Sequence, residues 1–241
     1  MIILEVIGCW LAAYMVCGAV HEGAHVVSGL CQGWKFMLLV VGPFKLYRDE
    51  NDKVKFGIEK NILLWGGIGG TLPREEGGNY MQVFANTLIA GPTASVVFGL
   101  VAGVVMVFHF SIFSAMMCAV PLAMGVSCLL PGVKSGILFN DGTRYSRIAK
   151  GGRTAAEEEA VFRCVLKEMF RPADRFDEQS INVMTGAEDT AFRYMGHYYA
   201  CCNAMKDGDE ARKAQELAAM ESLKGSVSKG VISMCAIEEQ Q

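Results

Sequence analysis

The sequence has no CxxC pair, although it contains nine cysteines among its 241 residues. They are scattered, and five of them lie in or beside apolar segments, where a thiol behaves as a small hydrophobic group. This pattern predicts neither a disulfide framework nor a zinc site built from cysteines. An excess of positive charge is missing too, because the formal net charge is −3, and this argues against a nucleic-acid partner.

Charged side chains are almost absent from residues 2–20, where Glu5 is the only one. This run also lacks the basic start and the clean cleavage site of a secretory signal peptide, so we expect it to be retained. Hydrophobic residues make up 52% of the chain, which is more than a soluble domain usually has. The composition therefore predicts a membrane protein.

Three apolar stretches, 2–30, 84–110 and 112–131, are long enough to cross a bilayer as helices. Almost no chain separates the second stretch from the third, so these two should form an antiparallel hairpin, and Pro121 predicts a kink in the third. The predicted fold class is an α-helical membrane protein with a three-helix transmembrane core.

Residues 34–60 predict a β-hairpin after the first helix. An apolar, β-branched run over 34–47 is followed by the polar turn 48–52 and by alternating polar and apolar side chains over 53–58. The Gly-rich piece 62–72 is too short to span a bilayer, and we expect it to be re-entrant or to lie at the interface.

Lys and Arg are missing from the N-terminal end and from the turn at 107–112. They are frequent in the 31–83 connection and at the start of the C-terminal tail: Lys35, Lys45, Arg48, Lys53, Lys55, Lys60 and Arg74, then Arg144, Arg147, Lys150 and Arg153. The positive-inside rule predicts a multi-pass protein of the cell membrane, with its N-terminus outside and the connection and tail in the cytoplasm.

Residues 153–241 predict a cytoplasmic helical domain. The pattern over 154–170 is that of an amphipathic helix ended by Pro172, and 190–205 with 210–223 predicts a helical hairpin. The hairpin resembles one tetratricopeptide-type unit, although an ordinary helical hairpin fits the pattern as well. The domain holds no cluster of metal ligands, so we expect it to bind a protein partner rather than to catalyse.

The motif His21-Glu22-Gly23-Ala24-His25 lies inside the first apolar stretch. On a helix this spacing puts both imidazoles on one face, where they can ligate Zn²⁺, and the Glu between them can act as general base for a water molecule. Ionisable residues in a membrane span are costly and mark functional sites. A chance motif in a helix, or a polar patch between packed helices, is the alternative.

Asp141 is the expected third ligand, because a catalytic zinc site takes three from the protein. It follows the third apolar stretch on its predicted cytoplasmic side, at the membrane level expected for His21 and His25. Gly142 allows a sharp turn that would aim the carboxylate inward. Asp-Gly is also an ordinary turn dipeptide, so a purely structural role for Asp141 stays open.

These residues resemble the site-2 protease family of intramembrane zinc metalloproteases. That family carries His-Glu-x-x-His in one transmembrane helix and a metal-binding Asp, in an Asn-x-x-Pro…Asp-Gly motif, near a later one. Residues 21–25 match the first motif fully, and Cys128–Pro131 with Asp141-Gly142 matches the second in part. The resemblance covers residues 1–147, including the hairpin over 34–60, which is a family feature.

Two positions depart from the family pattern. Cys128 stands where the family has Asn, and the element that begins Gly91-Pro92 ends in Ser95 where the family has Gly-Pro-x-x-Asn. The family uses these Asn positions to hold or orient substrate. The resemblance therefore implies a weak substrate-handling role for Gly91, Pro92, Ser95 and Cys128.

The resemblance implies a zinc metalloendopeptidase that cleaves a membrane-embedded helical substrate or peptide remnant, as in regulated intramembrane proteolysis. Its partners would be the lipid bilayer and a membrane protein or peptide. Glu22 would be the catalytic base, and a strand of the hairpin would pair with the opened substrate. The alternative is a catalytically inactive, protease-like scaffold that binds a membrane partner. The missing Asn residues favour the scaffold, whereas Glu22 and both His favour the enzyme.

Overall fold

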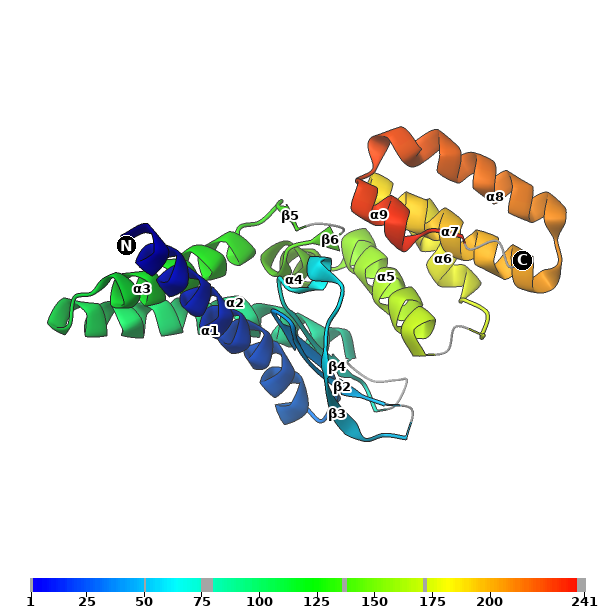
Figure 1. Ribbon diagram of the computed structural model, residues 1–241. Coiled ribbons are helices and arrows are strands. Elements are labelled where there is room, and N and C mark those ends of the chain that lie inside the picture. The colour runs from blue at the N-terminus through cyan, green and yellow to red at the C-terminus, as the bar shows by residue number, and fades with distance from the viewer. Residues whose placement is uncertain (1, 50, 75–79, 136–137, 171–172, 238–241) are drawn as a thin grey trace. The chain divides into compact units, whose positions relative to one another are not determined.

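The computed structural model describes residues 2–49, 51–74, 80–135, 138–170 and 173–237. It is mostly helical and divides into two compact units (Figure 1). The first, here called the helix–sheet unit, comprises Met1–Val133 and Asn140–Tyr145. The second, the helical unit, comprises Lys134–Phe139 and Ser146–Gln241.

Three long apolar helices form most of the helix–sheet unit: α1 (Ile2–Cys31), α2 (Tyr80–Phe108) and α3 (Ile112–Leu129). All three are long and apolar enough to cross a membrane, which confirms the prediction of three such helices. Each packs against the other two. The predicted second stretch, 84–110, begins four residues after the first residue of α2.

Small residues let α2 and α3 approach closely. A Cβ at Gly99 would lie 2.7 Å from Leu122 Cγ, and one at Gly125 would lie 2.8 Å from the Pro92 carbonyl oxygen. Such close contacts are typical of helices that pack in lipid, where van der Waals packing replaces the hydrophobic effect. Ser111 begins α3 with a capping box, because it and Ser114 each accept the other's backbone N–H.

A four-stranded antiparallel sheet follows α1, with the order β3-β2-β1-β4. Its strands are β1 (Lys35–Val41), β2 (Phe44–Arg48), β3 (Val54–Ile58) and β4 (Ile68–Leu72). Residues 34–60 thus form three strands where the sequence predicted a two-stranded hairpin. The extra turn is Gly42-Pro43, which joins Val41 to Phe44, and Gly42 adopts φ +54° there.

Strand β4 was not predicted, because the Gly-rich piece 62–72 was expected to be re-entrant or to lie at the interface. The structure places a short 3₁₀ helix at Ile62–Leu64 and then pairs β4 with β1. The glycines permit a close approach to α1: a Cβ at Gly69 would lie 2.3 Å from the Glu22 carbonyl oxygen. A Cβ at Gly29 of α1 would meet Thr71 of β4 in the same way. Close packing against α1 therefore explains why β4 is rich in glycine.

Helix α4 (Asp141–Lys150) begins in the helix–sheet unit, and its second half belongs to the helical unit. The helical unit then contains α5 (Gly152–Phe170), α6 (Glu178–Thr185), α7 (Thr190–Asp207), α8 (Glu210–Leu223), the 3₁₀ helix Lys224–Ser226 and α9 (Lys229–Met234). A two-stranded ribbon pairs β5 (Lys134–Ser135) with β6 (Leu138–Phe139). The predicted helices at 154–170, 190–205 and 210–223 are present, whereas α4, α6 and α9 were missed. Pro172 lies outside the described residues.

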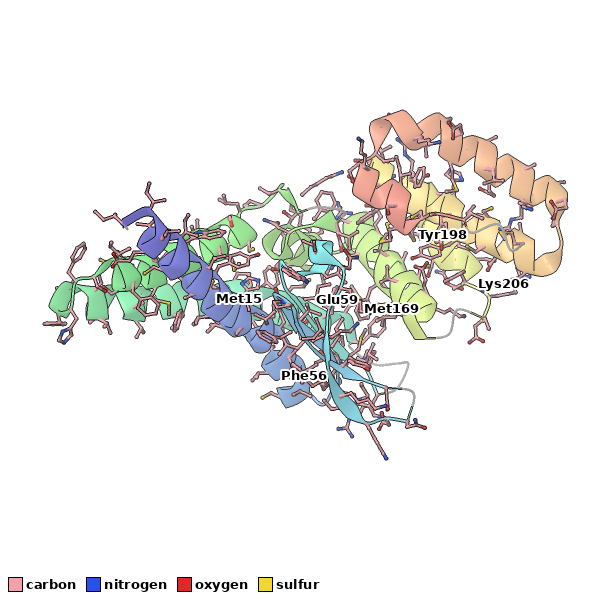
Figure 2. All side chains as sticks on the ribbon, viewed as in Figure 1. Met15, Phe56, Glu59, Met169, Tyr198 and Lys206 are labelled. Atoms are coloured by element: carbon pink, nitrogen blue, oxygen red, sulfur yellow. The ribbon has the colours of Figure 1, made fainter. Side chains whose placement is uncertain are left out.

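The helical unit has an apolar core and a set of buried polar contacts. Its largest fully buried side chains include Phe192, Met195 and Tyr199 of α7. Tyr199 and its neighbour Tyr198, the latter labelled in Figure 2, both donate hydrogen bonds of 2.8 Å to the Glu168 carboxylate. These paired contacts satisfy polar groups that burial would otherwise penalise. The unit is thus a folded helical array with its own core.

Candidate metal centre

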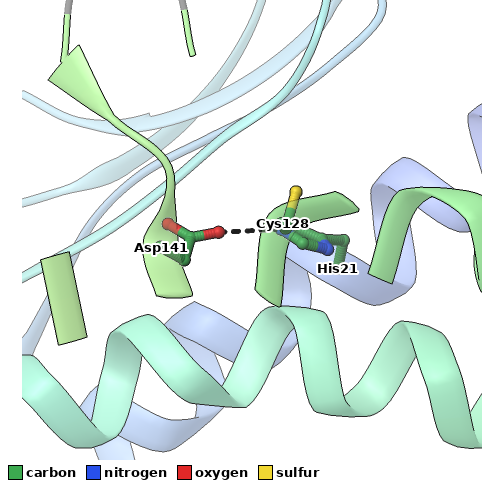
Figure 3. Close-up of side chains that lie close together, drawn as sticks. All are labelled: His21, Cys128 and Asp141. Carbon is green, nitrogen blue, oxygen red and sulfur yellow. Dashed lines mark ion pairs between the residues drawn. The ribbon is translucent and has the colours of Figure 1, made fainter. Parts of the chain in front are cut away.

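The structure brings His21, His25 and Asp141 together within the helix–sheet unit. His21 and His25 face the same side of α1, and Asp141 is the first residue of α4. The Asp141 Oδ2 atom lies 3.4 Å from His21 Nε2 and 3.6 Å from His25 Nε2. The imidazoles meet edge to face, with centroids 4.9 Å apart. Figure 3 shows the contact between His21 and Asp141.

The separations between Asp141 and each of the two imidazoles fit a tetrahedral zinc ion. Zn–N and Zn–O bonds of about 2.0–2.2 Å at tetrahedral angles put neighbouring ligand atoms ~3.4 Å apart. The Asp141–His21 and Asp141–His25 separations, 3.4 and 3.6 Å, are close to this value. The nitrogens of the two imidazoles lie farther from each other, because His21, His25 and Asp141 are not all within 4.8 Å of one another. Two imidazoles and a carboxylate are also a common protein ligand set for catalytic zinc. The donor chemistry of these residues therefore fits the metal that the family resemblance implies, and binding it would draw the two imidazoles closer together.

The other ring nitrogen of each imidazole is held from α2. His25 Nδ1 lies 2.6 Å from the Thr87 carbonyl oxygen, and His21 Nδ1 lies 2.9 Å from Ser95 Oγ. A carbonyl oxygen only accepts, so His25 donates from Nδ1, and its Nε2 is left for a metal. Such outer contacts fix the tautomer and the ring orientation of zinc-binding histidines. Helix α2 therefore orients both rings toward Asp141.

Asn140 sets the position of Asp141. Its side-chain oxygen accepts the Thr143 backbone N–H at 3.0 Å, which caps the start of α4. Its side-chain nitrogen donates to the carbonyl oxygens of Ser127 and Leu130, at 2.8 and 2.9 Å. The start of α4 is thereby fastened to the end of α3. This capping role of Asn140 was not predicted, although the spacing of Asn140 and Thr143 is that of an N-cap.

The turn predicted at Asp141-Gly142 is absent, because both residues are helical. Gly142 serves close packing instead: a Cβ there would lie 2.4 Å from the Leu129 carbonyl oxygen. Burial alone would raise the pKa of the Asp141 carboxyl, but the neighbouring His21 and His25 side chains outweigh it and hold that pKa below its usual range. Asp141 is therefore a carboxylate at neutral pH.

Two further glycines make room for the motif side chains. A Cβ at Gly91 would lie 2.3 Å from His25 Nε2, so this position admits only glycine beside the ring. Gly67, at φ +111°, lies before β4, and a Cβ there would lie 2.6 Å from Glu22 Oε1. The Glu22 carboxylate thus lies between α1 and the sheet, where it interacts electrostatically with His21 and His25.

The residues expected to handle substrate lie around the same centre. Gly91 contacts His25, Ser95 contacts His21, and the Pro92 backbone lies in the contact between α2 and α3. The Cys128 Sγ atom, a ring nitrogen of His21 and a carboxylate oxygen of Asp141 all lie within 4.8 Å of one another (Figure 3). In the part of the chain that the structure describes, no other group of three or more such ligands is this close together.

Replacing Ser95 by alanine should weaken metal binding by roughly 10–100-fold, the usual effect of removing a ligand's hydrogen-bond partner. His21 would lose its only described side-chain partner on α2. Affinity would be measured by competition with a chelating dye. The matched control is Thr93→Ala on the same helix, because the Thr93 hydroxyl donates only to the Ile89 carbonyl. Equal affinity in both variants would contradict the orienting role.

Comparison of the chain with protein-family models, with curated proteins and with solved structures found no match. The likeness to the site-2 protease family therefore rests on the motif residues alone. What the geometry defines is a His-Glu-x-x-His centre, completed by an Asp and set among three apolar helices.

Proposed function

We propose that this protein is an intramembrane zinc endopeptidase of the site-2 protease type, which cleaves a membrane-embedded helical substrate or peptide remnant. One observation carries the proposal: Asp141 of α4 reaches both imidazoles of the α1 motif. A chance motif gives no reason for a distant carboxylate to meet both rings. The Glu22 carboxylate beside them completes the set of groups that peptide hydrolysis at a metal needs.

Insertion in a membrane is supported by where apolar side chains are exposed. Large apolar residues at the outer ends of α1, α2 and α3 are exposed, among them Leu4, Val107 and Phe113. One face of the β2–β3 hairpin is exposed and apolar as well, and its members are Phe44, Leu46, Val54, Phe56 and Ile58. Phe56 is labelled in Figure 2. Surfaces of this kind suit contact with lipid.

In the proposed reaction the protein's own groups position and move protons. Zn²⁺ held by His21, His25 and Asp141 would supply Lewis acidity to the scissile carbonyl and to water. Glu22 takes a proton from the attacking water and passes it to the leaving amine. Thr87 and Ser95 keep the imidazoles oriented while charge develops in the site. Placing these groups at membrane depth explains why the substrate would be a membrane segment.

The opened substrate would pair with the outer edge of β4. Among the described strands, β4 ends the sheet on the side that touches α1, and Gly67 and Gly69 lie against Glu22. An extended peptide added to this edge would run past the Glu22 carboxylate. From the sequence we expected a strand of the hairpin over 34–60 to take this role. Strand β4 lies outside that range, at the opposite edge of the sheet from β3.

The proposal is tested with purified protein in lipid vesicles that also contain single-span test peptides. Products would be mapped by mass spectrometry, and bound metal would be measured on the same sample. We expect one zinc per chain, cleavage within the apolar segment, loss of cleavage on chelation and recovery with added Zn²⁺. Cleavage that persists after the metal is removed would rule the mechanism out.

An inactive scaffold is the second candidate, and the placement of Cys128 favours it. A thiol lies beside His21 and Asp141 at a position where the resembling family has a substrate-binding Asn. A scaffold would hold metal and partner without using Glu22 as a base. Substitution of Glu22 therefore separates the two candidates.

The proposed topology has the N-terminus outside and residues 31–83 and the C-terminal tail in the cytoplasm, as the distribution of Lys and Arg indicates. The exposed positions His109 and Lys150 would be replaced by cysteine in separate variants. A membrane-impermeant maleimide, applied to intact cells and mapped by mass spectrometry, should label residue 109 but not residue 150. The reverse pattern would overturn the topology.

A further inference from the structure

We infer that Cys128 is a fourth protein ligand of the metal centre, so that the site is closed at rest and opens when the thiol leaves. The inference rests on the zinc centre of the proposed function and adds a means of regulation to it. Nothing in the sequence indicated such a role, because Cys128 belongs to no CxxC pair and lies in an apolar run.

Three ligand atoms from three separate helices lie close together. Cys128 is near the end of α3, His21 is on α1, and Asp141 begins α4. Their ligand atoms lie within 4.8 Å of one another. With a Zn–S bond of about 2.3 Å, tetrahedral geometry requires ~3.6 Å between sulfur and its neighbours. The sulfur therefore lies at most about 1 Å farther from the His21 and Asp141 ligand atoms than a shared zinc ion requires.

Cys128 and Asp141 are held together by the same backbone contacts. Asn140 donates to the carbonyl oxygens of Ser127 and Leu130, which lie on either side of Cys128 in the chain. A Cβ at Gly142 would lie 2.8 Å from the Cys128 carbonyl oxygen. The segment that presents the carboxylate is thus fastened to the turn of helix that presents the thiol. Backbone contacts therefore hold Cys128 and Asp141 near each other, whatever rotamers their side chains adopt.

Two imidazoles, a carboxylate and a thiolate would fill four positions around zinc. Sites with four protein ligands are usually structural, whereas catalytic sites keep one position open. Cys128 would bind as the thiolate, and its proton would pass to solvent. When the thiolate leaves and takes a proton from solvent, one position becomes free. The arrangement is therefore a latent form of the proposed site, in which release of Cys128 permits cleavage.

Cys118 supplies a matched control. It lies on the same helix, ten residues earlier, which is about 15 Å along the axis. Both thiols are half-buried, and Cys118 Sγ lies 3.2 Å from where a Cβ at Gly103 would be, in the contact between α2 and α3. Replacing either cysteine by serine removes one thiol from α3, but only Cys128 lies at the centre.

The test is the absorption spectrum of the full chain loaded with Co²⁺ in place of zinc. The parent and Cys118→Ser should show both visible cobalt bands and the near-ultraviolet charge-transfer band of a cobalt–thiolate bond. Cys128→Ser should keep the visible bands and lose the charge-transfer band. Visible bands without a charge-transfer band in the parent, or a band that survives in Cys128→Ser, would overturn the inference but leave the metal centre standing. Absence of all cobalt bands would overturn both.

Two further measurements use zinc. Bound zinc should slow alkylation of Cys128, mapped by mass spectrometry, by more than tenfold and leave Cys118 unchanged. At saturating zinc, Cys128→Ala should cleave test peptides faster than the parent, because one coordination position is then always free. Equal alkylation of Cys128 with and without zinc, or a slower Cys128→Ala enzyme that has bound its full zinc, would refute the closed resting site.

Discussion

Replacing Glu22 by glutamine should lower the rate of peptide cleavage by about 10²–10⁴-fold, the usual contribution of a positioned acid–base group. Glutamine keeps the shape of the side chain but cannot take a proton from water. The metal content should stay at the parental level, because Glu22 is not among the three ligands that converge. Cleavage rate and zinc content would be measured on the same preparation in vesicles.

The matched control is Glu5→Gln, on the same helix but at its exposed N-terminal end. It removes an identical charge without touching the centre, so its cleavage rate should match that of the parent. If Glu22→Gln cleaved as fast as the parent while zinc remained bound, the general-base mechanism would fail. A different result would favour the inactive scaffold. In that case neither the parent nor Glu22→Gln would cleave any test peptide, and both would bind zinc and a membrane partner equally.

The sequence alone predicted the features that have a regular period or a local motif. Three apolar runs gave the three long helices, and the i, i+4 spacing of His21 and His25 put both rings on one face. Asp141 was chosen by its place after the third run, and the structure puts it beside both rings. That it binds zinc there stays a prediction.

Features that depend on contacts between distant segments could not be predicted in this way. The Thr87 partner of His25 is a backbone carbonyl, which has no signature in a sequence. The Gly-rich piece 62–72 was not recognised as a strand, because the reason for its glycines, the close approach of β4 to Glu22, appears only after folding. The role of Asn140 could not be predicted either, since the two carbonyl groups to which its side chain donates lie ten and thirteen residues earlier in the chain. The family resemblance assigned Ser95 to substrate handling, and nothing in the sequence shows that its side chain contacts His21.

The second large effect is expected for Asp141→Asn. The amide has nearly the shape of the carboxylate but no charge, and it is a poor zinc ligand. Structural zinc sites bind with apparent free energies of about 10–16 kcal/mol, so one of three or four ligands accounts for a few kcal/mol, or about 10²–10³-fold in affinity. Zinc affinity, measured by competition with a chelating dye, should fall by that factor, and cleavage should fall with it.

The fold should survive this change, because the cap of α4 is made by Asn140 and Thr143 rather than by Asp141. Far-ultraviolet circular dichroism of Asp141→Asn should therefore match the parent. Asp52→Asn is the control, since Asp52 lies in the exposed turn between β2 and β3, where loss of its ion pairs with Lys35 and Arg48 should leave zinc affinity unchanged. If Asp141→Asn bound zinc as tightly as the parent, the carboxylate would be no ligand. The two imidazoles would then need another partner, and the proposed peptidase site would lose the residue that distinguishes it from a chance motif.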